Sequence, residues 1–150
     1  MTVLITGASR GIGKAIAEIF AANGKNLFLS SRSEVALYKV MEELQTKYPS
    51  VSIKAKAFDL SDKQQAKDLG IWCLKYAIPD IIINNAGLFE PGSVNNEPEG
   101  LLESQLAISL HSLTFNSCSS FLAWSVLYLL KCEVGLYSIS SIIIHVLCGK

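Results

Sequence analysis

A glycine-rich stretch near the amino terminus constrains the fold of this chain more than any other feature. It reads Thr-Gly-Ala-Ser-Arg-Gly-Ile-Gly over residues 6–13. The short apolar segment 2–5 before it predicts a buried strand, and the residues after it predict a helix that ends at Asn23-Gly24. The apolar residues that recur at helical spacing are Ile12, Ala15, Ile16, Ile19 and Phe20. A strand that enters a helix through glycines is typical of a βα unit that binds a phosphate group.

Each glycine of this turn has its own physical role in such a unit. Gly7 lets the chain leave the strand sharply, Gly11 lets a pyrophosphate approach the backbone, and Gly13 lets the helix pack closely on the strand. The candidate ligand-binding residues of the turn are Gly7, Ser9, Arg10, Gly11, Ile12 and Gly13. The competing interpretation is a glycine-rich βα turn that holds no ligand.

The alternation of strands and helices continues to residue 83. Further strands are predicted at 26–30, 51–58 and 81–83, and further helices from the N-cap Ser33 to about Lys47 and from about 59 to 76. Alternating apolar and polar residues in 51–58 indicate a strand at an edge of the sheet or one that is half covered. The order βαβαβαβ predicts an α/β fold of the Rossmann type, a doubly wound parallel sheet in a three-layer αβα arrangement that is incomplete on its C-terminal side.

The end of the second predicted strand indicates which dinucleotide such a fold would prefer. This strand ends in Ser30-Ser31-Arg32, without a carboxylate. In dinucleotide sites an acidic residue at this point binds the ribose hydroxyls, whereas an arginine accommodates a 2′-phosphate. Arg32 can pair with a phosphate through two charge-assisted hydrogen bonds, and Arg10 adds a second cation. We therefore expect Ser31 and Arg32 to bind cofactor, and NADP(H) to bind more tightly than NAD(H), unless both arginines are only solvated.

Two further motifs complete a pattern that resembles the short-chain dehydrogenase/reductase family, of the classical type. Asp59-Leu60 follows the third predicted strand, and Asn84-Asn85-Ala86-Gly87 follows the fourth. The resemblance covers residues 1–108. It implies that Asp59 contacts the adenine amino group, that Leu60 lines the adenine pocket, and that Asn84 braces the sheet. It also implies that Asn85, Ala86 and Gly87 lie against the nicotinamide-side ribose. For Asp59, an N-cap of the helix that starts near Ser61 is a second interpretation, and both can hold.

The resemblance implies a catalytic tyrosine and lysine four residues apart, and the sequence departs from that pattern. Tyr137 is the candidate catalytic residue, but position 141 is serine, and the next lysine is Lys150. Ser109 occupies the position expected for an asparagine, and Ser119 and Ser125 are the candidate upstream serines. The implied reaction is hydride transfer between nicotinamide and a small-molecule carbonyl or alcohol. Because the lysine that lowers the tyrosine pKa is absent from its position, we expect a catalytically incomplete chain. The alternative is a non-catalytic nucleotide-binding or interaction protein.

The distribution of charged residues changes near residue 108. The length of the chain nevertheless suits a single domain over 1–150. Residues 109–150 carry three of the 26 charged side chains, three of the four cysteines and nine serines. This divergent apolar tail has three interpretations. We favour a damaged or out-of-frame continuation of a reductase. The others are an alternative ending, with a strand at 141–147 beside the fourth strand, and a membrane anchor at 113–130. If the sheet stops after four or five strands, an exposed edge is expected beside 81–83.

The balance of charges narrows the classes of partner. Thirteen basic and thirteen acidic residues give a formal net charge of zero, which disfavours nucleic acid and an anionic membrane as partners. The sequence begins without a signal-peptide pattern, and the cysteines lack CxxC or zinc-type spacing. We therefore expect a cytoplasmic protein with free thiols and no metal site. A homo-oligomer is compatible with the sequence.

Overall fold

The computed structural model describes residues 1–87, Gly100, Ile108 and residues 143–146. The elements are β1 (Thr2–Thr6), α1 (Gly11–Ala22), β2 (Asn26–Ser31), α2 (Glu34–Lys47), β3 (Ile53–Ala57), α3 (Lys63–Leu74), β4 (Ile81–Asn84) and β5 (Ile143–Val146). The alternation of strands and helices predicted for residues 2–83 is therefore confirmed. Ser33 is the N-cap of α2, as predicted, because its side chain accepts a hydrogen bond from the backbone N–H of Ala36.

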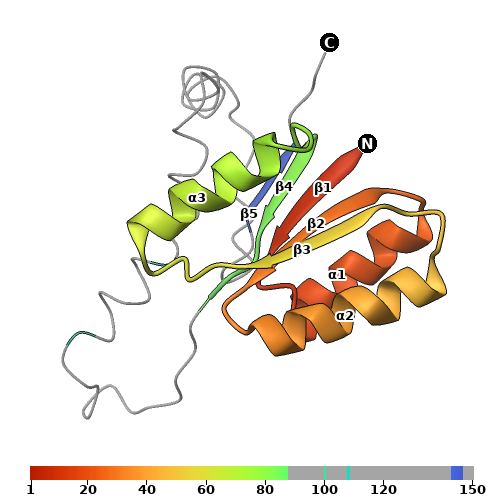
Figure 1. Cartoon of the computed structure of the whole chain (residues 1–150), viewed down its shortest axis with the longest axis horizontal. Helices are drawn as coiled ribbons and strands as arrows, with labels where there is room; N and C mark the ends of the chain where they lie inside the picture. The colour runs from red at the N-terminus through yellow and green to blue at the C-terminus, as the bar shows by residue number, and fades with distance from the viewer. Residues whose placement is uncertain (88–99, 101–107, 109–142, 147–150) are drawn as a thin grey trace.

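The sheet has the strand order β3-β2-β1-β4-β5. Its first four strands are parallel, so their carboxyl ends lie at one edge of the sheet (Figure 1). The strand β1 is central and buried throughout, whereas β3 lies at an edge and is only partly buried, as its alternating pattern predicts.

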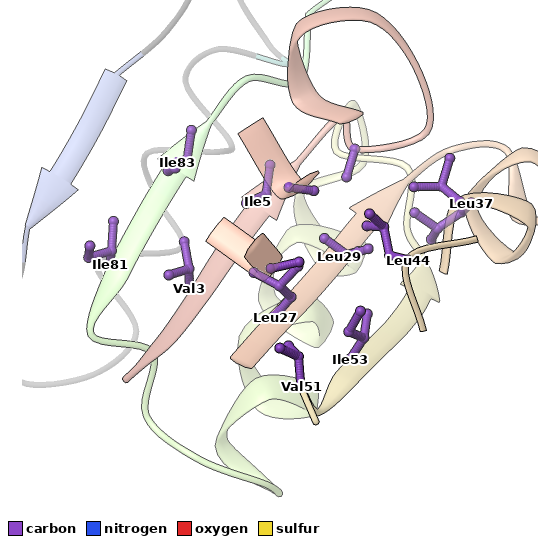
Figure 2. Close-up of a cluster of buried hydrophobic side chains, with 14 residues drawn as sticks. Val3, Ile5, Leu27, Leu29, Leu37, Leu44, Val51, Ile53, Ile81 and Ile83 are labelled. Carbon is purple, nitrogen blue, oxygen red and sulfur yellow. The ribbon is translucent and has the colours of Figure 1, made fainter. Parts of the chain in front are cut away.

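Helices cover both faces of the sheet, which confirms the three-layer arrangement. The helices α1 and α2 lie on one face and α3 lies on the other (Figure 1). Figure 2 shows the larger cluster, in which side chains of β1 to β4 meet those of α2. The second cluster, beneath α3, contains Phe28, Phe58 and Trp72, with the Phe28 and Trp72 rings packed edge to face at a centroid distance of 5.6 Å.

The helix α1 packs through small residues rather than through its large apolar ones. Its buried residues are Gly13, Ala17 and Ala21, four positions apart. Ile12 and Ile19, which belong to the helical pattern in the sequence, are each 61% exposed. Small side chains bring the helix axis close to the sheet, so the amino terminus of α1 lies close to the end of β1.

The start of α3 differs from the sequence prediction. The helix begins at Lys63, and its N-cap is Asp62, whose side chain accepts a hydrogen bond from the backbone N–H of Gln64 at 2.7 Å. The interpretation of Asp59 as the N-cap is therefore wrong. Asp59 instead forms a turn with Ser61, because its Oδ1 accepts hydrogen bonds from the N–H and the hydroxyl of Ser61.

The strand β5 corrects one expectation about the edge of the sheet. It pairs with β4 over Ile81–Asn84, so the edge expected to be exposed beside 81–83 has a neighbouring strand. A strand beside the fourth one is what the alternative-ending interpretation predicts for residues 141–147. Its direction is antiparallel, unlike that of the other four strands. The anchor candidate at 113–130 lies outside the described residues, and within the described ones no helix is long and apolar enough to cross a membrane.

Candidate functional site

The glycine turn between β1 and α1 has the backbone geometry that its sequence predicts. Gly7 and Gly11 have positive φ angles of 65° and 55°, a region that L side chains rarely adopt. Around Gly11 the described residues place no atom from outside its own helix backbone and its two chain neighbours within 4 Å of the position where a Cβ would stand, so this side of the turn is open among them. At Gly13 a Cβ would overlap the carbonyl oxygen of Gly7 and lie 2.5 Å from Nδ2 of Asn85. Gly13 therefore allows α1 to pack closely against the glycine turn and the side chain of Asn85.

The amino terminus of α1 lacks the side-chain cap that the other two described helices have. Arg10 occupies the N-cap position without a side-chain hydrogen bond, and the first turn holds no acidic residue. Ser33 and Asp62, by contrast, cap α2 and α3. The first N–H groups of a helix need acceptors, and together with the helix dipole they favour an anion. This end of α1 therefore has the properties of an anion-binding site.

A network of hydrogen bonds joins the turn to the end of β4. The hydroxyl of Thr6, which is 2% exposed, accepts from the backbone N–H groups of Asn85 and Ala86, each at 3.0 Å. The side-chain amide of Asn85 donates to the carbonyl oxygens of Thr6 and Gly7, each at 3.2 Å. The glycine turn, predicted to bind the pyrophosphate, and the segment after β4, predicted to bind the nicotinamide-side ribose, are thus fixed to each other.

The bracing role that the resemblance implies for Asn84, the last residue of β4, is played by Asn85, which follows it. Asn84 was expected to brace the sheet, but its Nδ2 is buried without a hydrogen-bond partner. Asn85 makes the bracing contacts instead, because its side chain lies against the carbonyl oxygens of the turn. Gly87, the last residue described in this segment, is exposed.

The two candidate arginines are exposed, one in the glycine turn and one at the carboxyl end of β2. Arg32 directly follows Ser31, whose buried hydroxyl donates to the carbonyl oxygen of Ser33 at 3.2 Å. Ser31 therefore shapes the loop that carries Arg32. The positive charge of Arg32 also contributes to the lowered pKa of Asp59 that is described below.

Asp59 and Leu60 lie in the loop between β3 and α3, at the same edge of the sheet. The hydrogen bond from the Ser61 hydroxyl lowers the pKa of Asp59, and the Ser61 N–H and the charge of Arg32 lower it further, while partial burial opposes them. Leu60 is 5% exposed and belongs to the cluster beneath α3. The structure therefore brings the turn, Arg32, Asp59 and Asn85 to the carboxyl ends of the parallel strands, where ligands of open α/β sheets bind.

Two residues that form the site are not among those predicted from the sequence. Thr6 belongs to the glycine motif, but the motif does not indicate that its hydroxyl accepts a hydrogen bond from the backbone N–H of Asn85. Gln65 accepts a hydrogen bond from the backbone N–H of Asp59 at 2.9 Å. Its signal in the sequence is the capping-box spacing Asp62-x-x-Gln65. The catalytic candidates Tyr137, Ser109, Ser119 and Ser125 lie outside the described residues, as does Lys150.

Comparison with known proteins gives the family. Residues 1–124 match the family model described as short chain dehydrogenase, so the match extends past residue 108. The chain is 34% identical over 98 residues to YvaG, an uncharacterized oxidoreductase of Bacillus subtilis, covering 65% of this chain and 36% of that protein. It is 42% identical over 86 residues to a very-long-chain 3-oxoacyl-CoA reductase of Meyerozyma guilliermondii, covering 56% and 25%. The chain thus spans about a third or less of the length of these relatives.

Solved structures show the same fold. A short-chain dehydrogenase from Sphingobium yanoikuyae in complex with NADPH has a TM-score of 0.69 and 33% sequence identity, covering 77% of this chain and 45% of that one. An alcohol dehydrogenase from Thermococcus sibiricus complexed with 5-hydroxy-NADP has a TM-score of 0.70 and 27% identity, covering 77% and 50%. Because the family match covers most of its sequence, the chain belongs to the short-chain dehydrogenase family.

Proposed function

We propose that this chain binds NADP(H) at the carboxyl ends of β1 to β4 and does not reduce carbonyl compounds efficiently. The observation that carries the proposal is the amino terminus of α1, which has no side-chain cap. The glycine turn that precedes this helix is held by a hydrogen bond from the side chain of Asn85. Support also comes from the S. yanoikuyae and T. sibiricus structures, which contain NADPH and 5-hydroxy-NADP.

From β3 to β4 across the sheet, the residues at the carboxyl ends of the strands would contact successive parts of the dinucleotide, from the adenine to the nicotinamide-side ribose. The N–H groups at the start of α1 would receive the pyrophosphate, and Gly11 leaves room for it. Ser9 and Ile12 would flank the pyrophosphate from the same turn. Asp59 would accept a hydrogen bond from the adenine amino group, and Leu60 would contribute mainly through its backbone because its side chain is buried.

Arg32 and Arg10 would distinguish NADP(H) from NAD(H). Both are exposed, and Ser31 holds the loop that carries Arg32. A guanidinium group can pair with a 2′-phosphate, whereas no carboxylate at the end of β2 is available for the ribose hydroxyls of NAD(H). Ala86 and Gly87 would lie against the nicotinamide-side ribose, while the side chain of Asn85 holds the turn in place.

The bound nicotinamide would supply hydride transfer to or from a small-molecule carbonyl or alcohol. Tyr137 would be the proton donor of this reaction, but serine stands at position 141, where a lysine would lower the tyrosine pKa. General acid catalysis contributes about 10²–10⁴-fold to such a rate. The loss of the lysine therefore favours a cofactor-binding protein with little turnover.

Titration of the full chain with NADPH and NADH by calorimetry tests the binding proposal. NADPH should bind at least about tenfold more tightly than NADH, and Arg32→Gln should remove most of that difference. Equal affinities for the two cofactors would contradict the proposed preference, and binding of neither would contradict the proposed site. Rapid oxidation of NADPH with a panel of aldehydes and ketones would contradict the proposed catalytic incompleteness.

A further inference from the structure

The side chain of Gln65 connects α3 to the loop that carries Asp59. Its Oε1 accepts a hydrogen bond from the backbone N–H of Asp59 at 2.9 Å, and its Nε2 donates to Oδ2 of Asp62 at 3.4 Å. Gln65 is half-buried and stands three residues after the N-cap of α3. It therefore holds Asp59, in the loop, from the first turn of the helix.

Gln65 occupies the glutamine position of a capping box, but it bonds the backbone N–H of Asp59 instead of that of the N-cap residue Asp62. In a capping box the side chain at this position accepts from the N–H of the N-cap residue. Here the N–H of Asp62 donates instead to the carbonyl oxygen of Asp59 at 3.2 Å, and Gln65 bonds the N–H of Asp59. The side chain that ordinarily caps the backbone at the start of a helix here fixes the position of Asp59 instead.

The surrounding hydrogen bonds leave one acceptor of Asp59 unused. Its N–H donates to Gln65, its carbonyl oxygen accepts from Asp62, and its Oδ1 accepts from the N–H and the hydroxyl of Ser61 at 2.9 and 2.7 Å. Just before it, the N–H of Phe58 donates to the carbonyl oxygen of Ser31 at 3.1 Å. Within the described part of the chain, Oδ2 of Asp59 takes no hydrogen bond, so it is available to a donor from a ligand.

We propose that Gln65 is a positioning residue for the adenine end of the cofactor, acting through Asp59. The inference rests on the proposed function, because it assumes that Asp59 accepts a hydrogen bond from the adenine amino group. Without Gln65 the Asp59 N–H loses its partner in the chain, and the loop gains freedom at the residue that recognises the base. The affinity for a ligand with the amino group then falls, whereas the affinity for a ligand without it changes little.

Two ligands and two matched variants test this role in the full chain. NADPH is compared with its hypoxanthine analogue, which carries a carbonyl oxygen in place of the 6-amino group. Gln65→Met removes both hydrogen bonds of Gln65 at nearly constant side-chain volume. Gln64→Met is the control, because the Gln64 side chain is exposed and donates to Asp68 rather than to the loop. Thermal unfolding of each variant shows that the fold persists.

The expected result is selective. Gln65→Met should weaken NADPH binding by about five- to tenfold and the analogue by less than about twofold, with Gln64→Met like the parent chain. Gln65→Ala removes the same acceptor and should show the same selective loss if Gln65→Met fails to fold. Equal loss of both ligands in either variant, or NADPH affinity equal to that of the parent chain, would overturn the positioning role alone. A parent chain that binds neither ligand would overturn the proposed function together with it.

Discussion

The side-chain amide of Asn85 donates to the carbonyl oxygen of Gly7 at 3.2 Å, across 78 positions of the sequence. The same nitrogen bonds the carbonyl oxygen of Thr6, while the Thr6 hydroxyl accepts the backbone N–H of Asn85. The contact is therefore reciprocal and uses groups that would otherwise lie unpaired at the ends of two strands. It fixes the glycine turn relative to the segment after β4 without any ligand.

Replacing Thr6 with valine should destabilise the fold. Thr6→Val keeps the shape of the side chain but leaves the N–H groups of Asn85 and Ala86 without their acceptor, at a cost of about 2–4 kcal/mol in unfolding free energy. Urea denaturation measures this change. Thr46→Val is the matched control, because Thr46 is an exposed helical residue whose hydroxyl bonds only within its own helix. A stability equal to that of the control would show that the Thr6 hydroxyl contributes nothing.

Gly13→Ala should reduce both stability and cofactor affinity. The added Cβ meets the carbonyl oxygen of Gly7 and the amide of Asn85, so the turn has to move, at a cost of about 1–3 kcal/mol. Gly24→Ala separates the two effects, because Gly24 has a φ of 69° but open space around it, far from the turn in the sequence. It should lose about 1 kcal/mol of stability and keep NADPH affinity. Unaltered NADPH binding in Gly13→Ala, measured by calorimetry, would contradict the proposed position of the pyrophosphate.

The acid limb of the stability curve should depend on Ser61. Hydrogen bonds from Ser61, with a smaller contribution from the charge of Arg32, hold the pKa of Asp59 below its usual value. Because the folded-state pKa is the lower one, this stabilisation is complete above the unfolded pKa of about 3.9 and is lost as the pH falls through the folded value.

Ser61→Ala removes the hydroxyl donor and should move the pKa of Asp59 upward, toward its usual value. Carboxyl NMR titration of the variant and the parent chain measures the shift. Ser52→Ala, at an exposed serine before β3, is the control and should leave the titration unchanged. An unchanged pKa in Ser61→Ala would mean that the hydroxyl does not set it.

Two salt bridges join α1 to α2, and reversing the charges of one pair should first lower Tm and then restore it. Lys14 pairs with Glu43, and Lys47 pairs with Glu18, each at 2.5 Å between nitrogen and oxygen. Glu18→Lys opposes Lys47 with a like charge and should lower Tm, while adding Lys47→Glu should restore much of the loss. Both changes should shrink at high ionic strength, because exposed pairs are screened. Failure of the double variant to recover at low salt would contradict a direct interaction.

Local patterns in the sequence were sufficient for the order of elements and for the glycine turn. The positive φ values of Gly7 and Gly11 follow from a strand that must turn sharply into a helix, which is a local requirement. The N-cap role of Ser33 is local in the same way. Non-local contacts were harder to predict. Large apolar residues marked α1 as a helix, yet its buried face consists of Gly13, Ala17 and Ala21, since packing distance decided which residues fit.

The sequence by itself determined that strands and helices alternate, that a glycine turn precedes α1, and that no carboxylate ends β2. These properties depend on residues close together in the chain. Only the tertiary structure decided that Asn85 rather than Asn84 holds the turn, that Gln65 bonds Asp59, and that β5 runs antiparallel to β4. Each of these depends on which donor and acceptor meet once distant segments pack, and hydrogen-bond geometry at about 3 Å is set by that packing.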